Sequence, residues 1–295
     1  MVRWSLVLVL VAGCEAPLPE WQPPPKPPTT PPSAEELLAA RPYTVRLPAG
    51  YDEAREWPLL LALHGYGGNG AEVVEHFHLD ALADAQGLLL IAPNGLRDAR
   101  GNFAWNPGRT RSPEWDPSWL TAVLRDAKQK YRVDARRVWA FGYSQGAHMA
   151  HRLGCDDSDD VVALASVAGQ VSKKPADCAP AQKVSVVQLH GTDDQVIGYL
   201  GDVQSATPDP DIPSAHETVA VWARNDGCTG PLERSAQSPI DLSIVPGEET
   251  LIDEYTGCPP GVAVALWSMV DVPHDPSPNA DFATKVFFFL SEHPR

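Results

Sequence analysis

The sequence has few basic residues for its length. Lys and Arg number 23 against 38 Asp and Glu in 295 residues, which gives a formal net charge of −15 at pH 7. Proteins that bind nucleic acid depend on clustered Lys and Arg, so this deficit excludes nucleic acid as a partner. Charged residues as a whole are only 21% of the chain, too few for a disordered protein. With 43% hydrophobic residues, the chain can bury a large core.

The apolar run near the N-terminus is short. Arg3 precedes apolar residues from Trp4 to Ala12, and the segment ends in Val11-Ala12-Gly13-Cys14. The run is too short for a membrane-spanning helix and is typical of an export signal. Its last four residues resemble a bacterial lipobox, which implies that Cys14 carries a lipid. An ordinary secretory signal with an incidental Cys is the alternative.

Prolines are concentrated in the next segment. Nine of the nineteen residues from Glu15 to Ser33 are proline, a composition that favours extended polyproline II and cannot form a core. We therefore predict an export signal over 1–14, a Pro-rich linker over 15–41 and a folded domain over 42–295. At about 3.1 Å per residue, residues 15–33 would reach on the order of 60 Å, enough to hold that domain clear of a surface.

Cysteine is also scarce. After Cys14 only Cys155, Cys178, Cys228 and Cys258 remain. An even number in an exported chain predicts two disulfides. Pairing neighbours along the chain gives Cys155 with Cys178 and Cys228 with Cys258, although the sequence allows three pairings in all.

From Tyr43 onward, short apolar runs alternate with helical patterns. The runs are rich in Val and Leu, and their nearly continuous apolar character predicts strands covered on both faces. They span 43–47, 58–64, 88–93, 137–142, 161–169, 183–190 and 262–270. Helices are predicted over 71–86, 118–131, 145–153, 214–225 and 281–292, and 229–254 is expected to be a hairpin excursion. The alternation predicts one three-layer α/β domain with a mostly parallel sheet.

A G-x-S-x-G motif lies between a predicted strand and a predicted helix, as Gly142-Tyr143-Ser144-Gln145-Gly146. This context is typical of a nucleophile elbow, whose sharp turn lifts the Ser hydroxyl above the sheet. We therefore predict that Ser144 is a nucleophile. The Gln145 N–H, at the helix N-terminus, is the first candidate oxyanion donor.

Glycines also follow an earlier predicted strand, in His64-Gly65-Tyr66-Gly67-Gly68. They let the backbone approach a ligand and present its N–H groups. We assign the second oxyanion donor to Tyr66, with Gly65 as the alternative.

A nucleophile elbow is followed in the chain by an acid and then by a histidine. The turn after 183–190 offers Asp193 and Asp194 as the acid. His216 lies on a predicted helix and His293 near the C-terminus, whereas His274 lies in the loop after the last predicted strand. Because such a loop can lie beside the elbow, we predict that His274 is the general base.

Metal chemistry is not predicted. His148 and His151 are spaced i, i+3 on the elbow helix and lack the spacing and Glu of a zinc-protease helix. The acidic run "CDDSDD" lacks the glycine and terminal Glu of a calcium loop. We expect neither a metal nor another cofactor.

Together these residues resemble the family of secreted poly(3-hydroxybutyrate) depolymerases, feruloyl esterases and acetylxylan esterases. The likeness runs in order from about Tyr43 to the C-terminus through "LHGYGGN", "GLLLIAPNG", "YRVDARRVWAFGYSQGAHMAHRLGC", "LHGTDDQV", "WARNDGC", "YTGC" and the last His loop. The resemblance implies an α/β-hydrolase fold with the triad Ser144, Asp194 and His274, because Asp194 rather than Asp193 matches the family pattern. It also implies that both neighbouring Cys pairs are disulfides.

Two departures from this family lie near the expected site. Where the family keeps a Gly-rich loop before the His and Trp-Pro after it, this chain has Asp271-Val272-Pro273 and Asp275-Pro276. Gln195 stands where a Pro usually follows the acid. We therefore expect the pocket near His274 to differ from that of the family.

These patterns predict a serine esterase that acts on small or oligomeric esters. We expect a monomer that is exported, is either lipid-anchored or secreted, and touches a membrane only through its lipid. Trp105 is expected to wall the acyl or aryl pocket, with plain packing as the alternative. A non-catalytic surface-binding lipoprotein and a serine peptidase on the same fold are the alternative functions.

The lipobox resemblance gives a direct test of Cys14. Wild-type chain expressed with a labelled fatty acid should incorporate the label, and Cys14→Ser should not, because the lipid needs the thiol. Label that persists in Cys14→Ser would contradict the lipoprotein assignment.

Overall fold

The structure is a computed structural model that describes residues 32–106, 116–174, 177–201 and 212–295. The predicted export signal with Cys14, and the Pro-rich linker as far as residue 31, lie outside the described residues.

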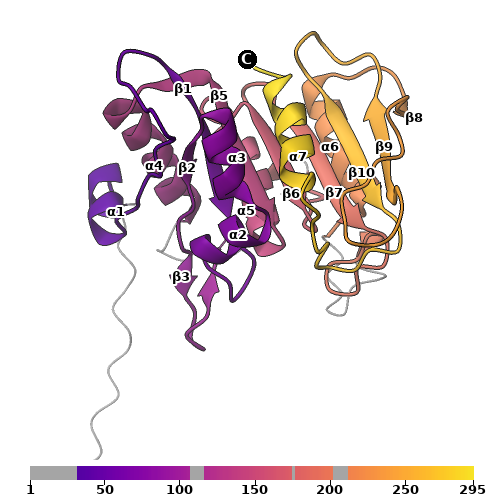
Figure 1. Cartoon of the computed structure of the whole chain (residues 1–295), viewed down its shortest axis with the longest axis horizontal. Helices are drawn as coiled ribbons and strands as arrows, with labels where there is room; N and C mark the ends of the chain where they lie inside the picture. The colour runs from indigo at the N-terminus through magenta and orange to yellow at the C-terminus, as the bar shows by residue number, and fades with distance from the viewer. Residues whose placement is uncertain (1–31, 107–115, 175–176, 202–211) are drawn as a thin grey trace, which may run out of the picture. The chain divides into compact units, whose positions relative to one another are not determined.

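An eight-stranded sheet forms the centre of the described part of the chain (Figure 1). Its strands are β1 (Trp57–Leu63), β2 (Leu89–Ile91), β5 (Val133–Tyr143), β6 (Ala163–Val167), β7 (Ser185–Gly191), β8 (Leu232–Arg234), β9 (Thr250–Tyr255) and β10 (Val264–Met269). Their order across the sheet is β2-β1-β5-β6-β7-β10-β9-β8. All pairs from β2 to β10 are parallel, whereas β9 and β8 are added antiparallel at one edge. The predicted hairpin excursion over 229–254 is thereby confirmed.

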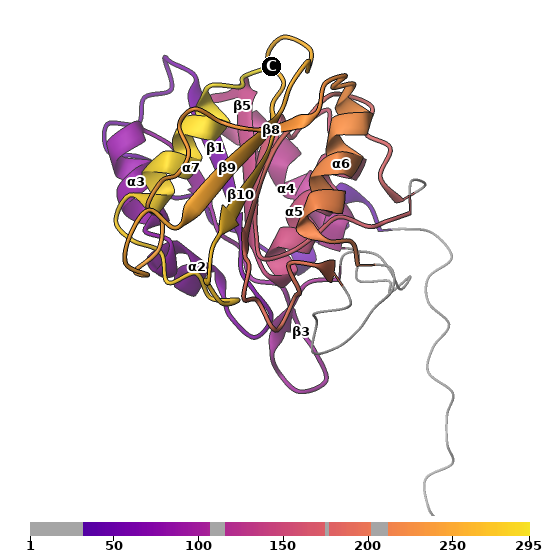
Figure 2. The same cartoon turned by 90° about the vertical axis from the view of Figure 1, so that its right-hand side faces the viewer.

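Helices cover both faces of this sheet (Figure 2). The helices are α1 (Ala34–Ala40), α2 (Gly70–His76), α3 (Leu79–Gln86), α4 (Asp116–Lys130), α5 (Gln145–Asp156), α6 (Ala215–Asp226) and α7 (Phe282–Ser291). α4, α5 and α6 pack on one face, and α2, α3 and α7 pack on the other. This confirms the predicted three-layer α/β domain with a mostly parallel central sheet.

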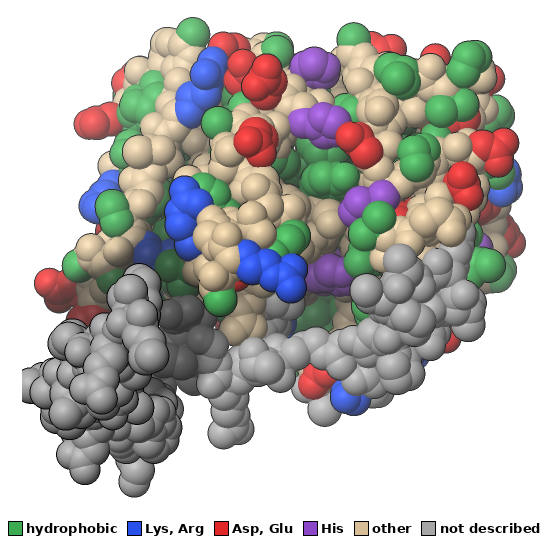
Figure 3. Space-filling view, turned by 90° about the horizontal axis from the view of Figure 1, so that it is seen from below, with side chains coloured by type: hydrophobic (Ala, Val, Ile, Leu, Met, Phe, Trp, Pro, Cys, Tyr) green, Lys and Arg blue, Asp and Glu red, His purple; other side chains and the backbone are tan. Residues whose placement is uncertain are grey.

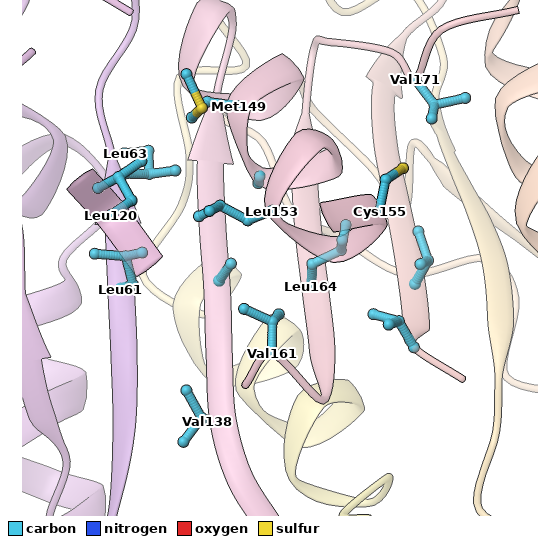
Figure 4. Close-up of a cluster of buried hydrophobic side chains, with 14 of the residues drawn as sticks. Leu61, Leu63, Leu120, Val138, Met149, Leu153, Cys155, Val161, Leu164 and Val171 are labelled. Atoms are coloured by element: carbon cyan, nitrogen blue, oxygen red, sulfur yellow. The ribbon is translucent and has the colours of Figure 1, made fainter. Parts of the chain in front are cut away.

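The central strands are apolar on both faces because successive side chains alternate between two hydrophobic cores, one on each side of the sheet. In β1, Leu61 and Leu63 belong to the core under α5, whereas Leu60 belongs to the core under α7. Figure 4 shows the first of these cores, in which Leu61 and Leu63 lie near Met149 and Leu153 of α5. Burying each such side chain stabilises the fold by about 1.5–3 kcal/mol.

Several predicted boundaries were wrong. The helix expected over 71–86 is two helices, because His78 takes a left-handed conformation (φ 53°) between α2 and α3. The strand expected over 43–47 reduces to a single bridge between Arg46 and Leu90. A short hairpin of β3 (Leu96–Arg97) and β4 (Phe103–Ala104) was not predicted.

The end of the predicted linker also differs, because helix α1 lies within 15–41. Ser33 caps this helix through a capping box with Glu36. α1 packs on α4, and the Arg41 side chain lies 3.7 Å from the ring centroid of Trp119. The compact unit begins at Pro32. The proline count did not reveal this helix because it begins where the prolines stop.

None of the helices in the described ranges is both long enough and apolar enough to cross a bilayer.

Two disulfides link Cys155 to Cys178 and Cys228 to Cys258. The pairing of sequence neighbours is therefore the one that the structure contains. Cys155 and Cys178 are buried, whereas Cys228 and Cys258 are half-buried.

The half-buried disulfide Cys228–Cys258 allows the stability contributed by a covalent link to be measured with little change to the core. It closes a loop with a sequence separation of 30, so Cys228→Ala/Cys258→Ala should lower the free energy of unfolding by about 3.5 kcal/mol. Urea unfolding of the oxidised proteins measures the difference. The buried Cys155→Ala/Cys178→Ala pair should lose more, because its sulfur atoms also leave the core. A loss under about 1 kcal/mol for the half-buried pair would contradict the loop-closure argument.

Candidate active site

A strained turn between β5 and α5 exposes Ser144. Its backbone has φ 55° and ψ −118°, a conformation that side-chain-bearing residues rarely adopt. The Ser144 N–H donates to the Val167 carbonyl at 2.8 Å, which ties the turn to β6. The strand-to-helix elbow predicted from the sequence is thus present.

The two glycines of the motif are required by close backbone contacts. A Cβ added at Gly142 would lie 2.2 Å from the Gly146 carbonyl oxygen, and one at Gly146 would lie 2.2 Å from the Leu63 carbonyl oxygen. Any side chain at either position would therefore collide with backbone. The spacing of glycine around Ser144 follows from how tightly α5 crosses β1 and β5.

Ser144 lies at one end of a hydrogen-bonded chain of three side chains. Its Oγ donates to His274 Nε2 at 2.9 Å, and His274 Nδ1 donates to Asp194 Oδ2 at 2.7 Å. The residues follow β5, β10 and β7, so the carboxyl ends of parallel strands bring them together. Figure 3 shows the face at which these loops lie, where histidine, acidic and hydrophobic side chains are close together.

The alternatives from the sequence lie elsewhere. Asp193 is exposed and accepts a 3.1 Å hydrogen bond from Gln195. The His216 ring packs edge-on against Tyr199, and His293 bonds to the Phe289 carbonyl at 2.6 Å. The structure brings Asp194 and His274, rather than these residues, to Ser144.

Asp194 is fully buried and is surrounded by donors. Val196 and Ile197 donate their N–H groups to Oδ1 at 2.8 and 2.9 Å. On Oδ2, His274 is joined by His190, whose Nε2 lies 3.2 Å away. Burial alone would raise the pKa of Asp194, but the hydrogen bonds from His190 and His274 outweigh it and lower the pKa.

The backbone N–H groups of Tyr66 and Gln145, the two candidate oxyanion donors, have no acceptor among the described residues. The loop of Tyr66 passes directly over the nucleophile, since a Cβ at Gly65 would lie 3.3 Å from Ser144 Cβ. The Tyr66 side chain is exposed, and its hydroxyl donates to Asp98 at 2.7 Å. Asp98, which anchors this loop, was not found from the sequence because it carries no motif.

Trp105 does not line the site as expected. Only 2% of it is exposed, and its indole N–H donates to the His64 carbonyl at 2.9 Å. Its backbone N–H donates to Gln145 Oε1 at 2.8 Å. The plain-packing alternative is therefore the correct one, and Trp105 joins the Tyr66 loop to the start of α5.

A cavity of about 210 Å³ adjoins the elbow. The Tyr66 loop, one side of α2, Tyr143 and Asp275 line it. Asp275 follows His274 and lies 3.0 Å from His76 Nε2. The carboxylates of Glu72 and Asp275 therefore line this cavity together with aromatic side chains.

Residues 51–207, just over half of the chain, match the model of a family described as phospholipase/carboxylesterase. The chain belongs to this family. Its members' α/β-hydrolase fold agrees with the sheet and helices described above. The likeness also confirms the resemblance to esterases that the sequence motifs indicated.

Relatives of this phospholipase/carboxylesterase family member include named esterases. It is 32% identical over 198 residues to the putative esterase NocK of Nocardia uniformis subsp. tsuyamanensis, which covers 64% of this chain and 56% of the relative. It is 26% identical over 231 residues to feruloyl esterase B of Piromyces equi, which covers 77% of this chain and 41% of the relative. The chain thus spans about half the length of these relatives.

Two solved structures share the fold. Acetyl xylan esterase from Aspergillus awamori superposes with a TM-score of 0.60 at 13% identity, covering 84% of this chain and 93% of that one. Esterase PE8 superposes with a TM-score of 0.55 at 17% identity, covering 85% of this chain and 98% of that one. At such identities the likeness concerns the fold alone.

The buried charge of Asp194 predicts a specific acid sensitivity of this family member. The unfolded chain protonates Asp194 near its ordinary pKa of 3.8, whereas the folded domain keeps it ionised to lower pH. Its contribution to stability is therefore full above about pH 5 and is lost progressively as the pH falls further. Between pH 6 and pH 3, wild type should lose more unfolding free energy in urea than Asp194→Asn loses.

The exposed neighbour Asp193 provides the matched control. Asp193→Asn removes the same charge from the same turn and should keep the wild-type difference between pH 6 and pH 3. If Asp194→Asn lost as much stability as wild type, the donors around Asp194 would not stabilise its charge.

Proposed function

We propose that this chain is a serine carboxylic ester hydrolase that acts through Ser144, His274 and Asp194. One observation carries the proposal: Ser144 Oγ, presented by a strained elbow, lies 2.9 Å from the Nε2 of an imidazole whose Nδ1 is held by a buried carboxylate. Membership of the phospholipase/carboxylesterase family and the esterase relatives support it.

The proposed reaction has two half-reactions on Ser144. His274 accepts the Ser144 proton as Oγ attacks the ester carbonyl, and Asp194 stabilises the imidazolium that forms. The N–H groups of Tyr66 and Gln145 stabilise the tetrahedral oxyanion. The alcohol leaves with the proton from His274, and water activated by the same imidazole then releases the acid from Ser144.

The proposed substrates are small or oligomeric esters. The cavity beside the elbow, at about 210 Å³, is smaller than the roughly 300–1,000 Å³ typical of pockets for drug-sized ligands. It therefore suits a small group on one side of the ester bond. One of the departures from the family pattern, Asp275, lines this cavity.

We further propose that the protein is exported and acts as a monomer. The two disulfides support export, because such bonds persist in oxidising compartments. In the proposed arrangement Cys14 carries the lipid, which is the protein's sole link to a membrane, and the Pro-rich segment separates it from the enzyme.

Hydrolysis of p-nitrophenyl acetate, p-nitrophenyl butyrate and methyl ferulate tests the mechanism. Ser144→Ala and His274→Ala should each lower kcat by roughly 10⁴-fold or more, because removing one triad member disables the whole unit. Their circular dichroism spectra should match that of wild type.

His216→Ala is the matched control for His274→Ala, since His216 also follows Asp194 in the chain but packs against Tyr199. It should keep activity within about twofold of wild type. Unchanged turnover in Ser144→Ala would exclude the proposed nucleophile. Wild type that hydrolyses no ester would favour a binding lipoprotein, and faster turnover of p-nitroanilides than of esters would favour a peptidase.

A further inference from the structure

A buried chain of hydrogen bonds leads from α6 to the acid of the triad. The Trp222 indole nitrogen lies 2.9 Å from His151 Nδ1, and His151 Nε2 lies 3.0 Å from Gln188 Oε1. Gln188 Nε2 lies 3.1 Å from His190 Nδ1, and His190 Nε2 lies 3.2 Å from Asp194 Oδ2. Each of these five residues is at most 1% exposed, so water does not compete for their hydrogen bonds.

Trp222, the first residue of this series, determines which atom donates and which accepts in every hydrogen bond that follows. An indole N–H can only donate, so His151 Nδ1 must accept and its Nε2 must carry the proton. That proton is donated to Gln188 Oε1, which places the amide NH₂ toward His190. His190 Nδ1 therefore accepts, and its Nε2 carries the proton, which lies between the Ile197 carbonyl at 2.8 Å and Asp194 Oδ2 at 3.2 Å.

Acceptors outside the chain require the same directions. The second N–H of Gln188 donates to the Gly169 carbonyl at 2.7 Å, so the amide cannot turn over. His190 Nε2 also lies 2.8 Å from the Ile197 carbonyl, which can only accept. Burial lowers the pKa of His151 to about 3, which keeps this imidazole neutral and able to accept from Trp222. The donors and acceptors required by Trp222 are therefore the same as those required by the Gly169 and Ile197 carbonyls.

We propose that His190 is a positioning residue for Asp194, and that Trp222, His151 and Gln188 fix His190 in the tautomer that holds its Nε2–H against this carboxylate and the Ile197 carbonyl. This inference rests on the proposed function, since it assigns a second histidine to the same acid. With His190 and His274 both on Oδ2, and Val196 and Ile197 on Oδ1, the carboxylate cannot rotate away from the general base.

Substitutions along the chain test this role through kinetics. His190→Phe and Gln188→Met should each lower kcat for p-nitrophenyl acetate about tenfold, because a slightly displaced acid misaligns the base. KM should stay within about twofold, since neither side chain touches the substrate. His190→Gln, whose amide restores an N–H near the position of Nε2, should recover most of the lost rate.

The far end of the chain has a matched control. Trp222→Phe removes an indole N–H that donates to His151, whereas Trp139→Phe removes one that has no partner among the described residues. Both rings are buried, so both variants should lose similar stability. Only Trp222→Phe should also lower kcat, by about threefold.

Nitrogen NMR of histidine-labelled wild type tests the tautomers without reference to activity. His151 and His190 should both carry their proton on Nε2 alone at pH 7, and Gln188→Met should let part of the His190 population carry it on Nδ1. A proton on Nδ1 of either wild-type ring, or His190→Phe with wild-type kcat, would overturn the inference. If the protein hydrolysed no ester, the proposed function would fail, and the spectra would still decide whether the chain exists.

Discussion

The backbone conformation of Ser144 is the constraint on which the rest of the site depends. Holding a residue with a side chain at φ 55° costs on the order of 1–3 kcal/mol. Two contacts offset this cost. Gly146 has no side chain, so the first turn of α5 packs directly against the backbone of β1, and the Val167 carbonyl of β6 accepts the Ser144 N–H. Once this turn is in place, α5 begins directly after Ser144, and the loop of Tyr66 passes so close that a Cβ at Gly65 would lie 3.3 Å from Ser144 Cβ.

The charge of Asp194 shows how local donors prevail over the field of the whole chain. The protein carries a formal net charge of −15, which by itself disfavours another buried carboxylate. His190 and His274, within 3.2 Å of one of its oxygens, nevertheless lower its pKa. Because Coulomb energies fall with distance and surface charges are screened by salt, the nearest partners decide the ionisation state.

Much of the fold could be predicted because its signals are local in the sequence. The apolar strands predicted the buried sheet, and the G-x-S-x-G motif between a strand and a helix predicted the turn at Ser144. Chain order and loop position were enough to choose His274 over two rivals. In each case a short segment carries its own physical requirement, such as glycine where a Cβ would collide with backbone.

Features that depend on contacts between distant segments could not be predicted in this way. The break at His78 has no glycine or proline, and it arises where Phe77 enters the core between α2 and α7. Trp105 was interpreted as a pocket wall because an aromatic residue in a loop fits either role. His151 and His190 looked like ordinary residues of a helix and a strand, since only the assembled sheet brings them to Gln188.

The two disulfides have a consequence for how the site assembles. His274 lies 80 residues from Asp194 and 130 residues from Ser144 along the chain, so the site joins widely separated segments. Cys155–Cys178 bypasses the segment between α5 and β7, and Cys228–Cys258 bypasses the segment between α6 and β10. The covalent path between the loops of Ser144, Asp194 and His274 is therefore shorter in the oxidised chain. Less conformational entropy is lost when these loops come together. An oxidised chain released from denaturant should thus refold faster than a reduced one, since contact order along the covalent path is lower.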